Sequence, residues 1–215
     1  MTAPLKLYTY FRSSAAWRVR IALAVKGVAA EAVPISLIKD GGQQHGDAYT
    51  AINPQHLVPA LVLPDGTALT QSLAIIDWLE AEFPTPSLLP ADPLQRARVL
   101  AAAHCIAMDV HPINNLRVLN QLAHQFGADA DAKAEWMRHW MRLGFDALSV
   151  LLKSGPYCFG NAITLADLCL VPQIYNARRW SLGMSAWPEL LAVEARCLEH
   201  PAFAATAPDI QPDAV

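Results

Sequence analysis

Three prolines within residues 84–90 divide this chain into two parts with different secondary-structure patterns. Proline fixes its own φ angle and disfavours helix at the residue before it, so this stretch predicts an extended linker. Short β-prone runs alternate with helical patterns before the linker, and nearly every stretch after it fits a helix. The 215 residues are enough for two small domains. We therefore predict an α/β domain over 1–83, a linker over 84–92 and an all-helical domain over 93–215.

The first part predicts the element order β-α-β-α-β-β-α. Its opening strand, helix and strand form a crossover unit, which makes the two strands parallel. Pro64-Asp65-Gly66 is a turn signal that predicts a hairpin. The expected elements are, in order, strand 5–10, a helix from Ser13 or Ser14 to Gly27, strand 31–35, a short helix near Ala48, strands 60–63 and 67–69, and helix 72–83.

The second part predicts four long helices, over about 93–125, 130–153, 164–179 and 187–199. Pro112 and Pro172 fall inside two of them, and each is expected to kink its helix because proline removes one backbone hydrogen bond. Thr164 and Asp167 have the spacing of a capping box. The tail beyond Phe203 is expected to be loosely packed.

Charge and composition exclude several functional classes. With 16 Lys and Arg against 19 Asp and Glu, the formal charge of -3 provides no field for holding nucleic acid or an anionic membrane. No uncharged apolar run reaches the roughly 18 residues of a membrane span, and no signal peptide is recognisable. The four cysteines contain no CxxC pair, so we expect free thiols, no metal site and a cytoplasmic location.

Two predicted strand-to-helix junctions are candidate anion sites. Ser13 and Ser14 begin the first helix, whose free N–H groups and positive dipole end stabilise an anion, including a thiolate. Gln71 and Ser72 begin a later helix, where an amide and a hydroxyl suit a ligand with a carboxylate and an ammonium group. In each case the plain alternative is an N-cap without a ligand. Val58-Pro59 would place an extended backbone edge between them for a peptide-like ligand, with a cis bond as one solution.

The helical part carries two further candidates. The first is a polar stripe at spacings of 4, 3 and 4 on one helix face, formed by His104, Met108, His111 and Asn115. It favours a wet cleft, although a helix–helix or subunit interface explains the same pattern, and the spacing does not suit zinc. Arg178 and Arg179 suit the dipole at a helix end, and at most one faces a given site, because adjacent residues point about 100° apart.

Several motifs resemble one family. The run Tyr8-Thr9-Tyr10-Phe11-Arg12-Ser13-Ser14, followed by Trp17-Arg18-Val19-Arg20, resembles the N-terminal signature of zeta-class glutathione transferases, which include maleylacetoacetate isomerase. His111-Pro112-Ile113-Asn114-Asn115 is more similar to bacterial maleylpyruvate isomerases of the same class. Further matching motifs, which extend the resemblance over essentially the whole chain, are 39–44, 53–55, 58–59, 71–76, 88–90 and 164–173.

The resemblance implies a thioredoxin-like domain followed by an all-helical domain, a homodimer, and glutathione as cofactor. It also implies that Ser13 holds the glutathione sulfur, with Ser14 and Ala15 beside it. The other implied glutathione contacts are Gln44 at the glycyl end, Val58 and a cis Pro59 at the cysteinyl backbone, Gln71 and Ser72 at the γ-glutamyl group, and His111 and Asn115 from the helical domain. The implied substrate-carboxylate contacts are Arg12 and Arg179, or its neighbour Arg178.

The activity that the resemblance implies is cis–trans isomerisation of a maleyl keto-acid, maleylacetoacetate or maleylpyruvate. The expected route is thiolate addition, bond rotation and elimination, with Ser13, Arg12 and Arg179 as catalytic residues. Many zeta-class members have Cys where this chain has Ala15, so a glutaredoxin-like disulfide reaction is not expected. Two alternatives stay open: a general transferase that conjugates glutathione to small electrophilic acids, and a non-catalytic glutathione-binding protein.

Overall fold

The computed structural model describes residues 3–153 and 155–214. The chain divides into two compact units, one of Met1–Ser87 with His200–Val215 and one of Leu88–Glu199. The predicted helical domain runs to residue 215, whereas the structure returns residues 200–214 to the first unit. The difference arises because these residues pack against the first helix of that unit rather than continuing the helical bundle.

A mixed sheet with the strand order β2-β1-β3-β4 forms the centre of the first unit. β1 (Leu5–Thr9) runs parallel to β2 (Ala30–Pro34), as the predicted crossover requires. β3 (Ala60–Val62) is antiparallel to both β1 and β4 (Ala68–Thr70), so the predicted hairpin is confirmed. This is the thioredoxin-like arrangement.

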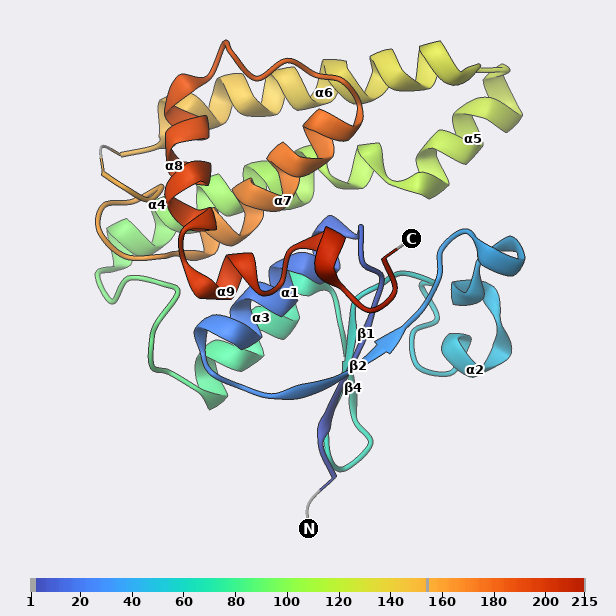
Figure 1. Ribbon diagram of the computed structural model, residues 1–215, viewed down its shortest axis with the longest axis horizontal. Helices are drawn as coiled ribbons and strands as arrows, with labels where there is room; N and C mark the ends of the chain where they lie inside the picture. The colour runs from blue at the N-terminus through green and yellow to red at the C-terminus, as the bar shows by residue number, and fades with distance from the viewer. Residues whose placement is uncertain (1–2, 154, 215) are drawn as a thin grey trace. The chain divides into compact units, whose positions relative to one another are not determined.

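Helices α1 and α3 lie on one side of this sheet and α2 lies on the other (Figure 1). α1 (Ser14–Val25) and α3 (Ser72–Glu82) pack against each other, and α2 (Asp47–Thr50) is a short helix at the predicted position. Ile21 of α1 and Leu79 of α3 have no exposed surface, because each helix turns its apolar face to the core.

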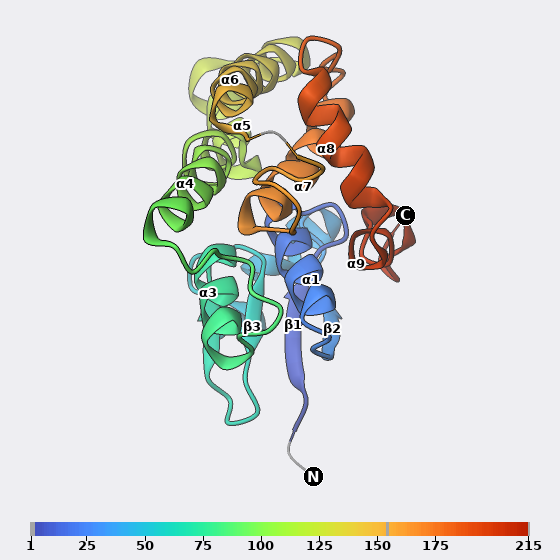
Figure 2. The ribbon, with the colours of Figure 1, turned by 90° about the vertical axis from the view of Figure 1, so that its left-hand side faces the viewer.

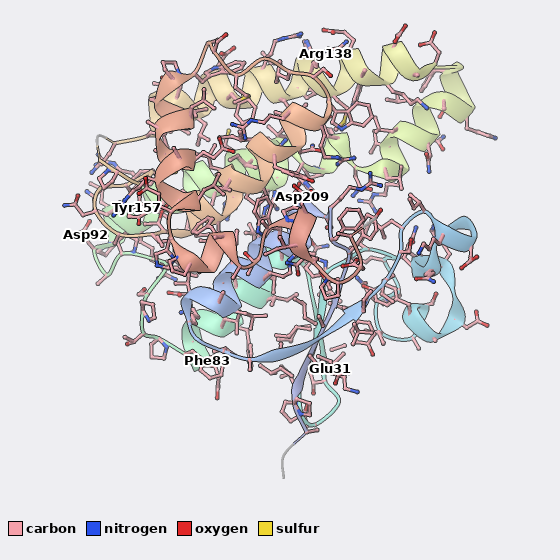
Figure 3. The ribbon with its side chains drawn as sticks, viewed as in Figure 1. Glu31, Phe83, Asp92, Arg138, Tyr157 and Asp209 are labelled. Carbon is pink, nitrogen blue, oxygen red and sulfur yellow. The ribbon has the colours of Figure 1, made fainter. Side chains whose placement is uncertain are left out.

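A buried lysine ties the end of α1 to the linker. Nζ of Lys26 lies 2.6 Å from Oε1 of Glu80, and the lysine side chain has no exposed surface. The same Nζ donates to the carbonyl oxygens of Phe83, at 2.7 Å, and Pro86, at 3.0 Å. Phe83, which Figure 3 labels, directly follows α3. One cation therefore fixes α1, α3 and the first linker residues to one another.

The segment after α9 (Pro201–Ala204) is well packed, so the expectation of a loose tail is wrong. The indole N–H of Trp17 donates to Oγ1 of Thr206 at 3.0 Å, and Pro208 is buried. Figure 1 shows α9 beside α1. Pro208 begins a short 3-10 turn, and side-chain hydrogen bonds hold the irregular backbone before it in place.

The second unit is a helical bundle in which α7 contacts α4, α6 and α8 (Figure 2). The predicted capping box is present, since the N–H and hydroxyl of Thr164 donate to Oδ2 of Asp167 at 2.7 and 2.8 Å. The N–H of Cys158 donates to Oδ1 of Asp167 at 2.8 Å, so this carboxylate also fixes the loop before α7. The helices of the unit are α4 (Pro93–His104), α5 (Leu116–Phe126), α6 (Ala130–Leu151), α7 (Leu165–Arg179) and α8 (Pro188–Leu198).

The helix predicted over 93–125 is interrupted. α4 ends at His104, a π-helical turn covers Cys105–Val110, and a 3-10 turn covers Pro112–Asn114 before α5 begins. Pro112 has no N–H, so the regular hydrogen-bond ladder breaks, and His111 N–H donates to the carbonyl of Ile106, five residues back, at 2.8 Å. The predicted stripe therefore does not share one helix face, which corrects the spacing argument for these four residues.

Candidate functional site

The candidate residues of the first unit gather at one edge of the sheet. Tyr8 of β1 pairs with Ala60 of β3, and Ala60 pairs with Thr70 of β4. Because β3 is antiparallel to its neighbours, β1 and β4 end where β3 begins. The segments that follow β1 and β4, and the segment that precedes β3, therefore share this edge, and both α1 and α3 start there.

Ser13 is the residue that caps α1. Its N–H donates to the carbonyl of Tyr10 at 2.9 Å, and its Oγ accepts from the N–H of Ala16 at 3.2 Å. The first turn of α1 contains no acidic residue, so no carboxylate in that turn neutralises the positive end of the helix dipole. Ser14 is buried and Ala15 is half-buried beside it. This junction can stabilise an anion placed at Ser13.

Arg12 is held next to Ser13 by its aromatic neighbours. Nη2 of Arg12 donates to the hydroxyl of Tyr10 at 2.9 Å, and its guanidinium lies 5.1 Å from the ring centroid of Phe11. Its Nε is buried and has no hydrogen-bond partner among the residues that the structure describes. A stacked guanidinium with unused donors suits a carboxylate ligand.

Gln44 is almost fully buried in the loop that follows β2. Its Oε1 has no hydrogen-bond partner within the described part of the chain. The backbone carbonyl of Gln44 is bonded to Nδ1 of His56 at 2.9 Å. Gly42 has φ of 102°, and a Cβ added there would lie 2.5 Å from Nε2 of Gln44. The loop therefore requires glycine at this position to place the Gln44 side chain.

Val58 lies two residues before β3, and its bond to Pro59 is cis, as the resemblance implies. Val58 packs with Tyr10 and Tyr49, which joins this segment to the end of β1. The hydroxyl of Tyr49 donates to the carbonyl of Leu57 at 2.6 Å, and burial raises the pKa of Tyr49 to about 12. No backbone hydrogen bond between described residues engages Val58, so its N–H and C=O can pair with an extended ligand.

Gln71 adopts a left-handed backbone conformation, with φ of 68°, directly before Ser72. Its Nε2 donates to Oε1 of Gln55 at 2.8 Å, which connects it to the segment that leads to Val58. Ser72 is the first residue of α3 and is buried. The plain N-cap alternative does not hold for Ser72, because Gln71 occupies the cap position and makes no side-chain capping bond. A non-glycine residue in this conformation is typical of functional sites.

The remaining candidates belong to the second unit. Asn115 caps α5, since its Oδ1 accepts from the N–H of Arg117 at 3.1 Å, and His111 precedes the break at Pro112. Arg178 forms a bidentate ion pair with Glu194, whose side chain is almost fully buried. The Arg178 guanidinium is thus committed to a structural contact, which argues against its implied substrate role. Nη1 of Arg179 donates to Oδ1 of Asn176 at 3.4 Å.

Three residues that the sequence analysis did not select also shape the first unit's site. His56 supports Gln44, Gln55 supports Gln71, and Arg20 donates to the carbonyl of Phe11 at 2.9 Å. None of these supports is visible as a local pattern. His56 has a left-handed backbone, with φ of 56°, but this feature can be seen only in the structure and not in the sequence.

The cysteines are free, as predicted, and Cys158, Cys169 and Cys197 are buried. No group of three or more His, Cys, Asp or Glu in the part of the chain that the structure describes has the arrangement of a metal site. The helices of the described residues are too short or too polar to cross a bilayer.

Comparison with known proteins places these observations in a family context. Residues 7–87 match the model of the glutathione S-transferase N-terminal domain. The chain is 45% identical over 209 residues to the maleylacetoacetate isomerase of Pseudomonas aeruginosa PAO1. The alignment covers 97% of this chain and 98% of that protein.

Two solved structures are similar over nearly their whole length. A holo maleylpyruvate isomerase, described as a bacterial zeta-class glutathione S-transferase, is 46% identical with a TM-score of 0.94, over 98% of this chain and 100% of that one. The maleylacetoacetate isomerase of Methylobacterium extorquens AM1, with bound malonate and glutathione, is 38% identical with a TM-score of 0.93, over 98% and 99%.

Proposed function

Because this chain belongs to the maleylacetoacetate isomerase family within the zeta class of glutathione transferases, we propose that it is a glutathione-dependent cis–trans isomerase of a maleyl keto-acid. The observation that carries the proposal is the shared edge of the sheet. There Ser13 caps a helix whose first turn contains no acidic residue, at the same edge as an extended backbone at Val58 and a left-handed Gln71. Ser13 suits a sulfur anion, the backbone of Val58 suits a peptide backbone, and Gln71 suits an amino-acid headgroup.

The residues of the first unit fit glutathione. Among the residues that the structure describes, the buried amide oxygen of Gln44 has no partner, and no backbone hydrogen bond engages Val58, two residues before β3. These are groups that a bound tripeptide would complete. Gln44 would hold the glycyl end, Val58 the cysteinyl backbone, and Gln71 with Ser72 the γ-glutamyl group. Support comes from the M. extorquens relative, whose structure contains glutathione.

When bound, glutathione supplies a thiolate that adds reversibly to the conjugated double bond of the substrate and so permits rotation about it. The chain must keep that sulfur ionised. A thiol has a pKa near 8.5, and lowering it by two units requires about 2.7 kcal/mol. The Ser13 hydroxyl can donate a charge-assisted hydrogen bond worth about 1.5–3 kcal/mol, and the start of α1 adds about 0.3–1 kcal/mol. Together these contribute about 1.8–4 kcal/mol, a range that includes the required amount.

Arginine side chains are proposed to hold the carboxylates of the substrate. Arg12, stacked on Phe11 beside Ser13, is placed to stabilise negative charge that develops on the substrate during the reaction. Arg179 is proposed as the second carboxylate contact, since Arg178 is occupied by Glu194. The malonate in the M. extorquens relative supports a dicarboxylic ligand for this family.

The test is product analysis with maleylpyruvate and maleylacetoacetate, each with and without glutathione. Isomerisation predicts that the fumaryl product forms only with glutathione and that the free thiol, titrated during the reaction, stays constant. Loss of one thiol per substrate would instead identify a conjugating transferase. Glutathione binding by calorimetry without turnover of either substrate would identify a non-catalytic binding protein. Either result would overturn the proposal.

A homodimer in a reducing cytoplasm is also proposed for this chain. The family resemblance supports the dimer, and the free, mostly buried cysteines suit a reducing compartment. Light scattering coupled to size exclusion at micromolar concentration tests the first point, because a monomer would elute with a mass near 23.4 kDa.

A further inference from the structure

The loop that places Ser13 depends on residues far away in the chain. β1 ends at Thr9 and α1 begins at Ser14, so Tyr10, Phe11 and Arg12 set where Ser13 lies. Within the loop, the N–H of Ser13 donates to the carbonyl of Tyr10 at 2.9 Å. This single turn bond does not fix the backbone of Phe11, a buried residue that lies between Tyr10 and Ser13.

Both backbone polar groups of Phe11 are held by side chains from outside the loop. Its carbonyl accepts from Nη2 of Arg20 on α1 at 2.9 Å. Its N–H donates to Oδ2 of Asp213 at 2.9 Å, a contact that spans 202 residues of sequence. A bond from an N–H to a carboxylate is stronger than one between neutral groups, and losing it would leave a buried donor unpaired.

Asp213 belongs to a segment that is itself fixed on both sides. We call residues 205–214 the tail segment. Near its start, Thr206 accepts from the indole of Trp17 at 3.0 Å and from Nε of Arg20 at 3.3 Å. At its other end, Ala214 packs against the apolar cluster that contains Phe11 and Val58. Figure 3 labels Asp209 in the middle of this segment.

Charge supports the same arrangement. Arg20 is buried, and burial lowers its pKa to about 10, whereas the negative charge of Asp213 acts in the opposite direction. Arg20 in turn donates to the hydroxyl of Thr9 at 2.9 Å and to the carbonyl of Phe11. With a pKa of about 10, Arg20 is a cation near neutral pH, so the carboxylate acts on the loop mainly through its bond to the Phe11 N–H.

We propose that Asp213 is a positioning residue for the reaction at Ser13, which it serves by fixing the Phe11 backbone. This inference rests on the proposed isomerase function, because it concerns how accurately the Ser13 hydroxyl meets the glutathione sulfur. Gln44, Gln71 and Ser72 are on other segments, so binding of glutathione itself depends little on Asp213. The expected defect is therefore in turnover and in thiol ionisation rather than in affinity.

The experiment compares Asp213→Ala, Asp213→Asn and the control Gln211→Ala in the full chain. Gln211 is in the tail segment, and its side chain donates to the carbonyl of Ala207 rather than to the loop. For Asp213→Ala we expect kcat to fall about tenfold, with KM for glutathione changed less than about twofold. The ultraviolet thiolate band of bound glutathione should titrate at higher pH than in the wild type. Asp213→Asn, whose amide oxygen can still accept from Phe11, should recover most of both losses.

The outcomes distinguish a failure of the positioning role from a failure of the isomerase proposal. A wild-type enzyme that isomerises, with Asp213→Ala equal to it in kcat and thiol titration, would overturn the positioning role and leave the function intact. Asp213→Asn as impaired as Asp213→Ala would also overturn it, because the hydrogen bond would then not matter. A titration shift in Asp213→Ala, without isomerase activity in the wild type, would refute the function and its positioning residue together, and would leave Asp213 with an effect on thiol ionisation only.

Discussion

The hydroxyl oxygen of Ser13 accepts a hydrogen bond from the backbone N–H of Ala16 at 3.2 Å. A hydroxyl both accepts and donates, so this cap leaves the Ser13 proton available for an anion at the same helix end. Capping α1 and holding a thiolate are therefore not competing interpretations of Ser13. One geometry serves both, since the acceptor side faces the helix and the proton can be directed away from it.

Replacing Ser13 by Ala should separate these two roles. We expect kcat to fall more than about tenfold because the donor to the sulfur is lost, while glutathione affinity is largely kept by contacts elsewhere. Loss of the cap should cost about 1 kcal/mol of folding free energy. Steady-state kinetics, calorimetric titration with glutathione and urea unfolding measure the three effects. Ser13→Thr, which retains a hydroxyl, is the matched control, and unaltered turnover in Ser13→Ala would remove Ser13 from the mechanism.

Arg179 should distinguish substrates by charge. If it binds a carboxylate, Arg179→Ala raises KM for a dicarboxylic substrate at least about tenfold, and changes KM for an uncharged electrophile much less. Paired kinetics with the two substrates at saturating glutathione provide the measurement. Equal effects on both would show that Arg179 does not recognise a carboxylate.

Arg178, its neighbour, should behave in the opposite way. Arg178→Ala leaves the almost fully buried carboxylate of Glu194 without its bidentate partner. Because about half of the arginine side chain is exposed, water screens part of the loss, and we expect about 1–3 kcal/mol of destabilisation with little change in KM. Urea unfolding checks the first effect. The assignment would be contradicted by a variant of normal stability with a raised KM for dicarboxylates.

The cysteines should be unreactive in the native protein. Burial raises the pKa of the Cys158 and Cys197 thiols, and less strongly that of Cys105. A higher pKa means less thiolate at a given pH, so alkylation at pH 8 should be slow in the fold and complete for all four thiols in denaturant. Thiol titration under both conditions tests this. Isomerase activity should survive the native treatment, because Ala15 leaves no cysteine at the start of α1; rapid inactivation would show that a protein thiol takes part.

Local signals account for the parts of the fold that could be predicted. The hairpin follows from Pro64-Asp65-Gly66, the start of α1 from Ser13 and Ser14, and the capping box from Thr164 and Asp167. Each depends on residues within a few positions of one another, so the sequence pattern contains all the necessary information. The candidate residues of the first unit could be selected for the same reason, since they stand at strand–helix junctions.

Long-range contacts account for what could not be predicted. Asp213 reaches Phe11 across 202 residues of sequence, and nothing in its sequence neighbourhood distinguishes it from any other acidic residue. The π-helical turn before Pro112 was not predicted, because a missing N–H can be accommodated in more than one way. In the helical part, the choice between Arg178 and Arg179 depended on Glu194, which is on another helix.

The buried Lys26–Glu80 pair is a further long-range contact, and it should contribute strongly to stability. Lys26→Met would leave the Glu80 carboxylate, which is only 10% exposed, without its cation, and would remove the donor to the carbonyls of Phe83 and Pro86. Breaking a buried pair in this way costs about 3–5 kcal/mol. Urea unfolding of the full chain provides the measurement.

The exposed Lys6–Glu31 pair is the matched control, since its side chains are 43% and 52% exposed and 3.8 Å apart. Lys6→Met should cost less than about 1 kcal/mol, because water and salt already screen that pair. The double variant Lys26→Met with Glu80→Met should be more stable than Lys26→Met alone, because the stranded charge is gone. Equal losses for Lys26→Met and Lys6→Met would show that the buried cation does not hold the linker against α1 and α3.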